Sequence, residues 1–218
     1  MAIEQFRMTK PAPIVWPNLV TPRPENPKLK TKPRFEVTFL FTRDHPDWAA
    51  MEQMMVKQCH AEFGEAGMGG RKYPAKDGTA EADAAQRKDP PRDREFLRGK
   101  IMFQPHGLVL NAKGDPVPPP RLVAVVNDAY RRFEPAERAL AREYFYSGVM
   151  AIGTFGFAAY QGFGGGVSAY LNEILSLNFG DRIQTGASDE DRYGDVRQYV
   201  GHVGQSTSYN PTAVHSIV

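Results

Sequence analysis

The clearest pattern in the chain is an alternation over residues 34–42, RFEVTFLFT, in which Arg34, Glu36, Thr38 and Leu40 separate apolar residues. Phe35, Val37, Phe39 and Phe41 recur at every second position. Because successive side chains of a strand point to opposite faces, this segment is predicted to be a strand with one buried face. We expect its phenylalanines to lie in the core.

A helical period follows directly after this strand. Four apolar residues recur at spacings of three and four positions, which places them on one stripe of a helix. They are Trp48, Met51, Met55 and Cys59. We predict a helix over residues 44–63, capped by Asp44 or Asp47 and ended by the glycines that begin at Gly64.

Strand-like segments return in the second half of the chain. They are residues 98–104, 122–127, 145–160 and 167–175. A short helix is predicted over residues 135–143, where a proline occupies the first turn. Without regular β-α-β alternation, this order favours a mainly β fold, a small five-stranded antiparallel barrel with one or two inserted helices and long loops.

The remaining segments predict one domain over residues 1–195 and a separate C-terminal tail over residues 196–218. Prolines punctuate residues 1–33, which predicts a basic arm with one short strand near residues 14–20. Residues 71–96 are polar and charged, as is typical of a long exposed loop.

The formal net charge of +2 is too small to indicate a nucleic-acid binder, but its distribution is uneven. Basic residues outnumber acidic ones in residues 1–34, and acidic residues predominate in residues 180–195. A basic segment can follow a phosphate backbone, whereas an acidic segment avoids it. The charge pattern therefore favours the N-terminal part as the side that meets a polyanion.

Sequence-tolerant binding of a single nucleic-acid strand needs cations along a groove and exposed aromatic faces. Three groups of candidate contacts are present: an alternating basic segment, a cluster after a glycine-rich bend, and one face of the strand expected at residues 98–104. The first group is Lys28, Lys30, Lys32 and Arg34, the second is Arg71, Lys72, Tyr73 and Lys76, and the third is Arg98 and Lys100. For the first two groups the alternative is a solvated loop.

Three further aromatic residues are candidates for stacking on bases. Trp16 lies beside prolines and near the basic arm, with burial as the alternative. Tyr146 and Tyr160 fall on one face of the strand expected over residues 145–160, and phenylalanines fall on the other. We expect the phenylalanines to face the core, which leaves the tyrosines for a binding face.

Enzyme signatures are missing from the sequence. The five histidines are scattered, without metal-ligand spacing. The segment Gly162–Gly166 lacks the Lys-Ser/Thr pair of a phosphate-binding loop, and the carboxylates of residues 189–195 lack the pattern of a calcium loop. We therefore expect no catalysis, no metal and no cofactor, and a metal-dependent nuclease is the weakest alternative.

Cys59 is the only cysteine, so a disulfide framework is excluded and a reducing compartment fits. The N-terminus has no apolar signal core, and no run of about 18 apolar residues is present. We expect a soluble cytoplasmic protein without membrane contact.

An ordered series of motifs runs through the last third of the chain. It consists of Tyr146-Ser147-Gly148, a strand ending at Tyr160, a glycine-rich hairpin, Val167-Ser168-Ala169, Leu171-Asn172-Glu173-Ile174, Gly180-Asp181, Gly186-Ala187-Ser188 and DEDRYGD at 189–195. Shorter motifs precede this series in the same order along the chain: Trp16-Pro17-Asn18-Leu19, the 35–41 strand, Asp77-Gly78, Arg98-Gly99-Lys100 and Val125-Val126-Asn127. From about residue 14 to residue 195 the chain thereby resembles a family of phage-encoded single-stranded DNA-binding proteins.

This resemblance implies an OB-type barrel that binds and protects single-stranded DNA during phage replication, recombination or repair, in the cytoplasm of the host cell. It also implies replication or recombination proteins as partners, and oligomers along DNA. Two features depart from the family: Met150 and Ile152 stand where an aromatic and a basic residue are common, and residues 196–218 contain no acidic residue. The alternative from another class is an assembly protein that uses the barrel for protein contacts.

Overall fold

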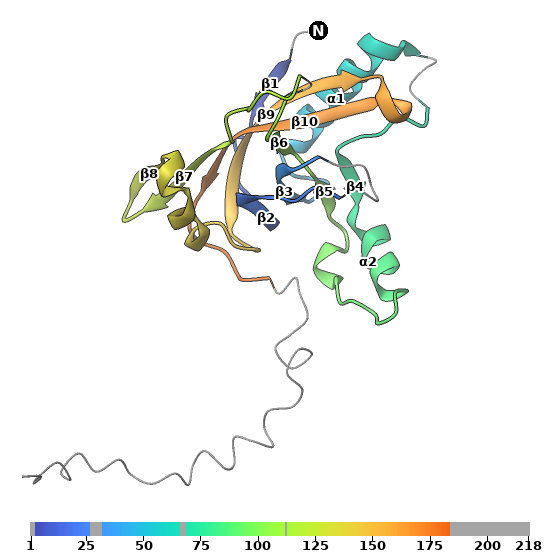
Figure 1. The fold of residues 1–218 in the computed structure, drawn as a ribbon. Coiled ribbons are helices and arrows are strands. Elements are labelled where there is room, and N and C mark those ends of the chain that lie inside the picture. Colours follow the sequence, from blue (N-terminus) through green and yellow to red (C-terminus); the bar gives the residue numbers. More distant parts are fainter. Residues whose placement is uncertain (1–2, 27–31, 66–68, 112, 184–218) are drawn as a thin grey trace, which may run out of the picture. The chain divides into compact units, whose positions relative to one another are not determined.

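The computed structural model describes residues 3–26, 32–65, 69–111 and 113–183, and this part is mainly β (Figure 1). Its strands are β1 (Glu4–Arg7), β2 (Ala12–Arg23), β3 (Arg34–Phe41), β4 (Ala75–Asp77), β5 (Ile101–Phe103), β6 (His106–Leu108), β7 (Arg121–Val126), β8 (Ala129–Phe133), β9 (Met150–Tyr160) and β10 (Gly166–Ser176). Its helices are α1 (Trp48–Phe63) and α2 (Gly78–Gln86), with 3-10 turns η3 (Glu95–Leu97), η4 (Pro135–Glu143) and η5 (Gly162–Gly164). Among the described helices, none has the length and apolar character to cross a membrane.

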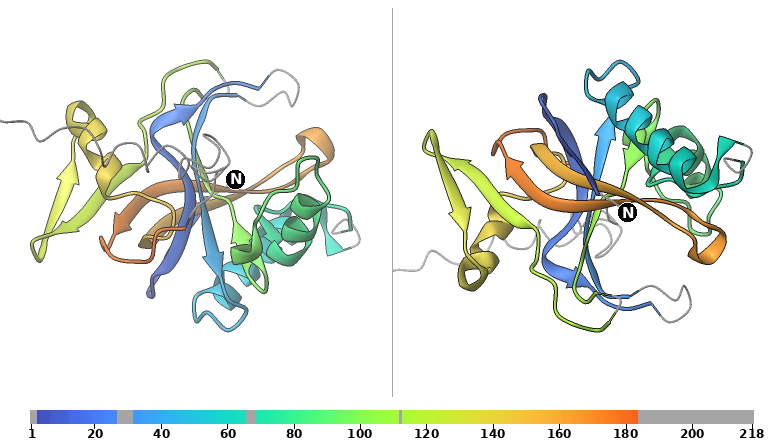
Figure 2. Two further views of the ribbon diagram at one scale, coloured as in Figure 1. Left: turned by 90° about the horizontal axis from the view of Figure 1, so that it is seen from below. Right: turned by 90° about the horizontal axis from the view of Figure 1, so that it is seen from above.

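The strand pairings form a cycle. They lead from β2 to β3, β6, β10 and β9, and β9 returns to β2 through the pairs Ala12↔Ala151 and Pro13↔Met150. Within this cycle β6 and β10 are parallel and the other pairs are antiparallel. Strand β1 extends the sheet beside β9, and the β7–β8 hairpin extends it beside β10 and projects to one side in both views of Figure 2.

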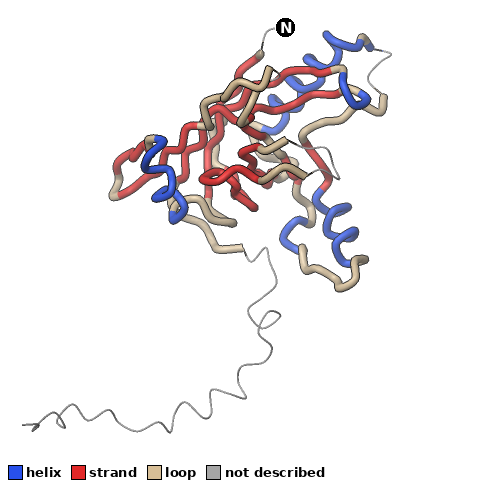
Figure 3. The backbone as a smooth tube through the Cα atoms, viewed as in Figure 1, coloured by secondary structure: helices blue, strands red, loops and turns tan. Residues whose placement is uncertain are grey.

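The inner face of the cycle holds a core of aromatic rings. The predicted burial of Phe35, Phe39 and Phe41 is confirmed. Phe103 packs between Phe41 and Phe155, at ring-centroid distances of 6.1 and 5.0 Å. The predicted stripe of α1 is buried as well, and α1 packs against β9, so that the helix closes this side of the core (Figure 3).

A second, smaller apolar cluster lies on the outer face of β3 and β5. Leu40 and Met102 project outward there and are covered by Ala82 of α2 and Leu97 of η3. Asp77 begins α2, because its carboxylate accepts hydrogen bonds from the backbone N–H groups of Thr79 and Ala80. The polar segment 71–96, expected to be a loop, therefore contains a helix that covers part of the sheet.

Other elements differ from the sequence expectations for local reasons. The N-terminal segment forms β1 and the long β2 instead of an arm with one short strand. Asp47 precedes α1 but makes no side-chain cap; its carboxylate accepts hydrogen bonds from the backbone N–H groups of Thr9 and Lys10 and ties α1 to the N-terminal segment. The strand expected over 98–104 is confined to β5, and the one expected over 145–160 begins at Met150. The domain boundary expected at residue 195 and the tail lie outside the described residues.

Candidate nucleic-acid interface

The outer face of β2, β3 and β5 is left uncovered beyond the edge of α2 and forms a groove of about 540 Å³, the β3 groove. Because Arg34, Glu36 and Thr38 alternate with buried core residues, the side chains of β3 form its floor. The lining residues are Trp16, Asn18, Arg23, Arg34, Glu36, Val37, Thr38, Lys76, Glu81, Arg94, Met102, Gln104 and His106.

Trp16 forms a wall of the β3 groove because the backbone of β2 bulges there. Its φ of 51° is left-handed, and the register between β2 and β3 shifts between Val15 and Asn18. The freed N–H of Trp16 donates to the hydroxyl of Ser147, 3.1 Å away. The Tyr-Ser-Gly motif thus holds the tryptophan in place, which gives a structural reason for one of the motifs of the sequence.

The indole of Trp16 is half-buried and already has partners on two sides. The ring of Phe96 meets it at an angle of 61°, with centroids 6.0 Å apart. The guanidinium of Arg94 lies over the indole at 4.7 Å. An aromatic face with a cation beside it suits both a base and its phosphate.

The β3 groove carries an excess of positive charge. Arg23 and Arg34 share one carboxylate, that of Glu36, at 2.9 and 2.8 Å, so that their net charge stays positive. Lys76 approaches Glu81 at 3.5 Å, with its side chain 53% exposed. With Arg94, four cations line the groove against two carboxylates. This distribution favours an anionic ligand.

His106 lies at the far side of the β3 groove, where β6 pairs with β3. Burial, with a further contribution from the charge of Arg34, lowers the pKa of His106 to about 4, although Glu36 acts in the opposite direction. The ring is therefore neutral at neutral pH. It lies 5.3 Å from the ring of Tyr170 on β10, so that the groove ends in a pair of aromatic faces.

The lowered pKa of His106 predicts a pH-dependent stability. In the unfolded chain the pKa of His106 is about 6.5, so below this pH the unfolded chain binds a proton that the folded chain does not. The free energy of unfolding is therefore highest above pH 6.5 and falls as the pH is lowered toward 4. We expect His106→Gln to remove about 1–3 kcal/mol of this pH-dependent loss in the free energy of unfolding; the effect is limited because the ring keeps some solvent contact. Urea unfolding at several pH values measures it, with His60→Gln on the exposed side of α1 as control. Equal pH dependence in wild type and His106→Gln would contradict the assignment.

The structure gathers three of the residues singled out from the sequence in the β3 groove: Trp16, Arg34 and Lys76. Lys32 is exposed just before β3, and Lys28 and Lys30 lie outside the described residues. Whether any of them contacts DNA stays a prediction.

Other candidates have partners elsewhere. The guanidinium of Arg98 binds the carboxylates of Asp83 and Glu95, both at 2.8 Å, and Lys100 is half-buried just before β5. Tyr73 packs against the core, where burial and a hydrogen bond with Cys59 raise its pKa to about 12. None of the three lines the β3 groove.

The remaining candidates lie near the hairpins and the C-terminal end of the described chain. Arg71 stacks on Phe63 at 4.0 Å, and the backbone of Lys72 pairs with the hairpin between β9 and β10. The hydroxyl of Tyr146 donates to the Gly180 carbonyl at 3.1 Å, and the residue precedes β9 instead of lying on it. Tyr160 ends β9 and is half-buried.

Sequence reasoning missed the polar groups of the β3 groove that can donate a hydrogen bond from nitrogen, other than those of the candidates above. They are Asn18, Arg23, Arg94, Gln104 and His106. Arg94 comes from the polar segment that was expected to be a loop, and only the packing of α2 and η3 brings it to Trp16. Arg23 is the register partner of Arg34 on the neighbouring strand, so pairing β2 with β3 would have identified it.

The fold of the described residues is similar to that of phage single-stranded DNA-binding proteins. The protein of this kind from bacteriophage Enc34 matches with a TM-score of 0.56 at 15% identity, over 87% of this chain and 89% of that chain. Its complex with single-stranded DNA matches with 0.53 at 16% identity, over 84% and 89%. gp2.5, a single-stranded DNA-binding protein encoded by bacteriophage T7, matches with 0.50 at 13% identity, over 90% and 97%. No family model and no curated protein sequence matches the chain.

Proposed function

We propose that this protein binds single-stranded DNA without sequence preference and that the strand lies in the β3 groove. The observation that carries the proposal is Trp16, an aromatic wall with Arg94 over its ring, among four cations on an uncovered sheet face. The likeness in fold to phage single-stranded DNA-binding proteins supports the same function.

An OB-type barrel is part of this proposal. The cyclic pairing of β2, β3, β6, β10 and β9, in which β6 and β10 alone run parallel, supports it. In OB folds, nucleic acid crosses the second and third strands, flanked by the loop that joins the first two. Here the corresponding connection, between β2 and β3, carries the basic residues Lys28, Lys30 and Lys32.

Binding in the β3 groove would proceed by exchange of ionic partners. Arg23 and Arg34 already share Glu36, so one guanidinium can turn to a phosphate while the other keeps the carboxylate neutralised. Each phosphate contact releases counterions, which makes affinity fall as salt rises. Stacking of a base on Trp16 would add about 1–3 kcal/mol without selecting a sequence.

We infer a non-catalytic role for the chain: coating and protecting single strands during phage replication, recombination or repair in the cytoplasm of the host. Within the described residues no group of three or more histidine, cysteine or acidic side chains is placed to hold a metal ion. Replication or recombination proteins as partners, and oligomers along DNA, belong to the same proposal.

Fluorescence anisotropy with labelled oligo-dT of about 16 nucleotides tests the proposal, since such a length spans a typical OB site. We expect binding that is stronger than to duplex DNA and weakens as salt rises. The double variant Arg23→Gln, Arg34→Gln should bind more weakly and flatten the salt dependence by about 1.4 in log-log slope. The double variant Lys57→Gln, Arg142→Gln, whose residues line no part of the groove, is the matched control. Absence of binding at low salt would overturn the proposal and favour the alternative of an assembly protein.

A further inference from the structure

Six residues stand in one row across the outer face of the sheet. Their register partners connect β2, β3, β6, β10, β9 and β1 in turn: Asn18↔Glu36, Glu36↔His106, His106↔Tyr170, Tyr170↔Gly156 and Gly156↔Gln5. Residues directly opposite each other on paired strands share a face. At about 4.8 Å per strand, the row extends for about 24 Å. A single surface therefore continues from the β3 groove past His106 and Tyr170.

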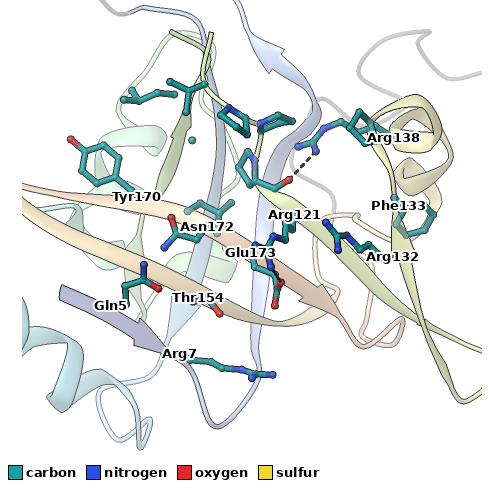
Figure 4. A pocket seen from close by; sticks show the side chains of 18 of the residues that line it. Gln5, Arg7, Arg121, Arg132, Phe133, Arg138, Thr154, Tyr170, Asn172 and Glu173 are labelled. Carbon is teal, nitrogen blue, oxygen red and sulfur yellow. Dashed lines mark hydrogen bonds and ion pairs between the residues drawn. The ribbon is translucent and has the colours of Figure 1, made fainter. Parts of the chain in front are cut away.

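Beyond Tyr170 this surface forms a second and larger groove of about 1050 Å³, the β10 groove (Figure 4). Its floor is the outer face of β1, β9 and β10, with the β7–β8 hairpin and the proline-rich segment before β7 as its wall. The residues that matter here are Gln5, Arg7, Arg121, Arg132, Tyr170 and Asn172.

The floor of the β10 groove is made largely of small and polar side chains where it crosses β9. Gly156 is buried beneath it, because the side chain of Ile3 lies over this glycine and would be 2.6 Å from a Cβ there. Its neighbours on the same face of β9 are the small residues Thr154 and Ala158. Polar groups from Gln5 and Asn172 flank this low strip and offer donors and acceptors (Figure 4).

The arginines of the β10 groove are only loosely engaged by the protein itself. Arg121 approaches Glu173 at 3.6 Å with its side chain 64% exposed, and Arg132 approaches Glu134 at 3.3 Å with its side chain 58% exposed. Arg7 is exposed and forms no ion pair with the described residues. Exposed ion pairs contribute little to stability, so these guanidiniums can turn to phosphates at small cost.

The wall of the β10 groove is fixed in position. Arg138 donates from Nη1 to the Pro120 carbonyl at 2.8 Å, the hydrogen bond drawn in Figure 4. It also donates from Nε to the Leu19 carbonyl at 2.8 Å, and its guanidinium lies 4.6 Å from the Phe35 ring. Burial lowers the pKa of Arg138 to about 10, so the group stays charged at neutral pH. Arg138 thereby ties the proline-rich segment to the barrel, and the groove exists before a ligand arrives.

We propose that a strand bound in the β3 groove continues over His106 and Tyr170 into the β10 groove, so that one chain engages one continuous strand across six β-strands. This inference rests on the proposed function. At the junction between the two grooves, a base of the strand stacks on the rings of His106 and Tyr170, whose centroids are 5.3 Å apart. The arginines of the β10 groove contact the phosphates of the part of the strand that lies in that groove.

The length dependence of oligo-dT binding tests the continuous path. Wild type should bind dT of about 16 nucleotides at least tenfold more tightly than dT of about 6. The double variant Arg121→Gln, Arg132→Gln should lose most of this gain and bind the short oligomer as wild type does. Arg7→Glu, on the opposite side of the β10 groove, should likewise lose most of the extra affinity for the longer oligomer. The control variant Lys57→Gln, Arg142→Gln should keep that extra affinity.

Three outcomes would overturn the continuous path while leaving the proposed function intact. The first is that both variants of the β10 groove still bind the longer oligomer more tightly than the shorter one, by the same factor as wild type. The second is that they lose affinity equally for both oligomers, and the third is that wild type binds two short oligomers per chain and binds the longer one no more tightly. Wild type that binds neither oligomer would instead overturn the proposed function itself. As a control for folding, each variant should have the same thermal unfolding temperature as wild type, so that the affinities compared are those of folded proteins.

Discussion

Trp16→Ala is expected to lower the affinity for oligo-dT by about 1–3 kcal/mol, which is roughly 5- to 150-fold. The loss arises because the indole offers the aromatic wall of the β3 groove and because Arg94 loses the ring that holds its guanidinium in place. Trp16→Phe keeps an aromatic face and should recover part of the affinity. An affinity of Trp16→Ala equal to that of wild type would remove Trp16 from the binding site.

Intrinsic fluorescence gives an independent measure, because the chain has only two tryptophans. Trp48 is 7% exposed and packs in the core against Phe41 and Phe103. Quenching by oligo-dT should therefore come from Trp16: it should persist in Trp48→Phe and vanish in Trp16→Phe. The reverse pattern would place the strand elsewhere.

Phe155→Ala should lower the free energy of unfolding by about 3–5 kcal/mol, the largest effect on stability that we expect from one substitution. Phe155 is fully buried at the centre of the aromatic core, and its ring meets those of Phe39 and Phe103 edge to face at 5.4 and 5.0 Å. Truncation leaves a cavity that the surrounding strands cannot close, because all belong to the same cyclic sheet.

Denaturant unfolding measures this loss directly. The matched control is Tyr130→Ala on β8, whose side chain is 77% exposed and should change stability by less than about 0.5 kcal/mol. If Phe155→Ala and Tyr130→Ala were equally stable, the aromatic cluster would not be the centre of the core.

The sequence predicts best those elements whose periodicity spans several turns or pleats. The alternation of β3 and the apolar stripe of α1 are examples, because each carries its own burial pattern. The short strands β6 and β8 were missed, since three to five residues give no period and the strands exist only through pairing with neighbours. The helix α2 was hidden in a polar segment, because its one buried side is formed by small residues such as Ala82.

The candidate interface was predicted in part for the same reason. Arg34 begins the alternating strand β3, so its side of the sheet follows from the local pattern, whereas Trp16 reaches the groove through the bulge in β2. Arg94 reaches the groove only through tertiary packing, which no local pattern reveals. Arg98 and Tyr73 were candidates by residue type. In the fold, Arg98 pairs with acidic neighbours and Tyr73 packs against the core, and neither environment follows from composition.

Photocrosslinking tests most directly whether the strand lies in the β3 groove. Oligo-dT with single 5-iodouracil substitutions, bound to the full chain and irradiated, should attach to Trp16 and to His106 on the far side of the groove, as mapped by mass spectrometry of the peptides. High salt should abolish these adducts together with binding. Adducts confined to the surface of α1, or none at Trp16 and His106 under saturating binding, would contradict the account.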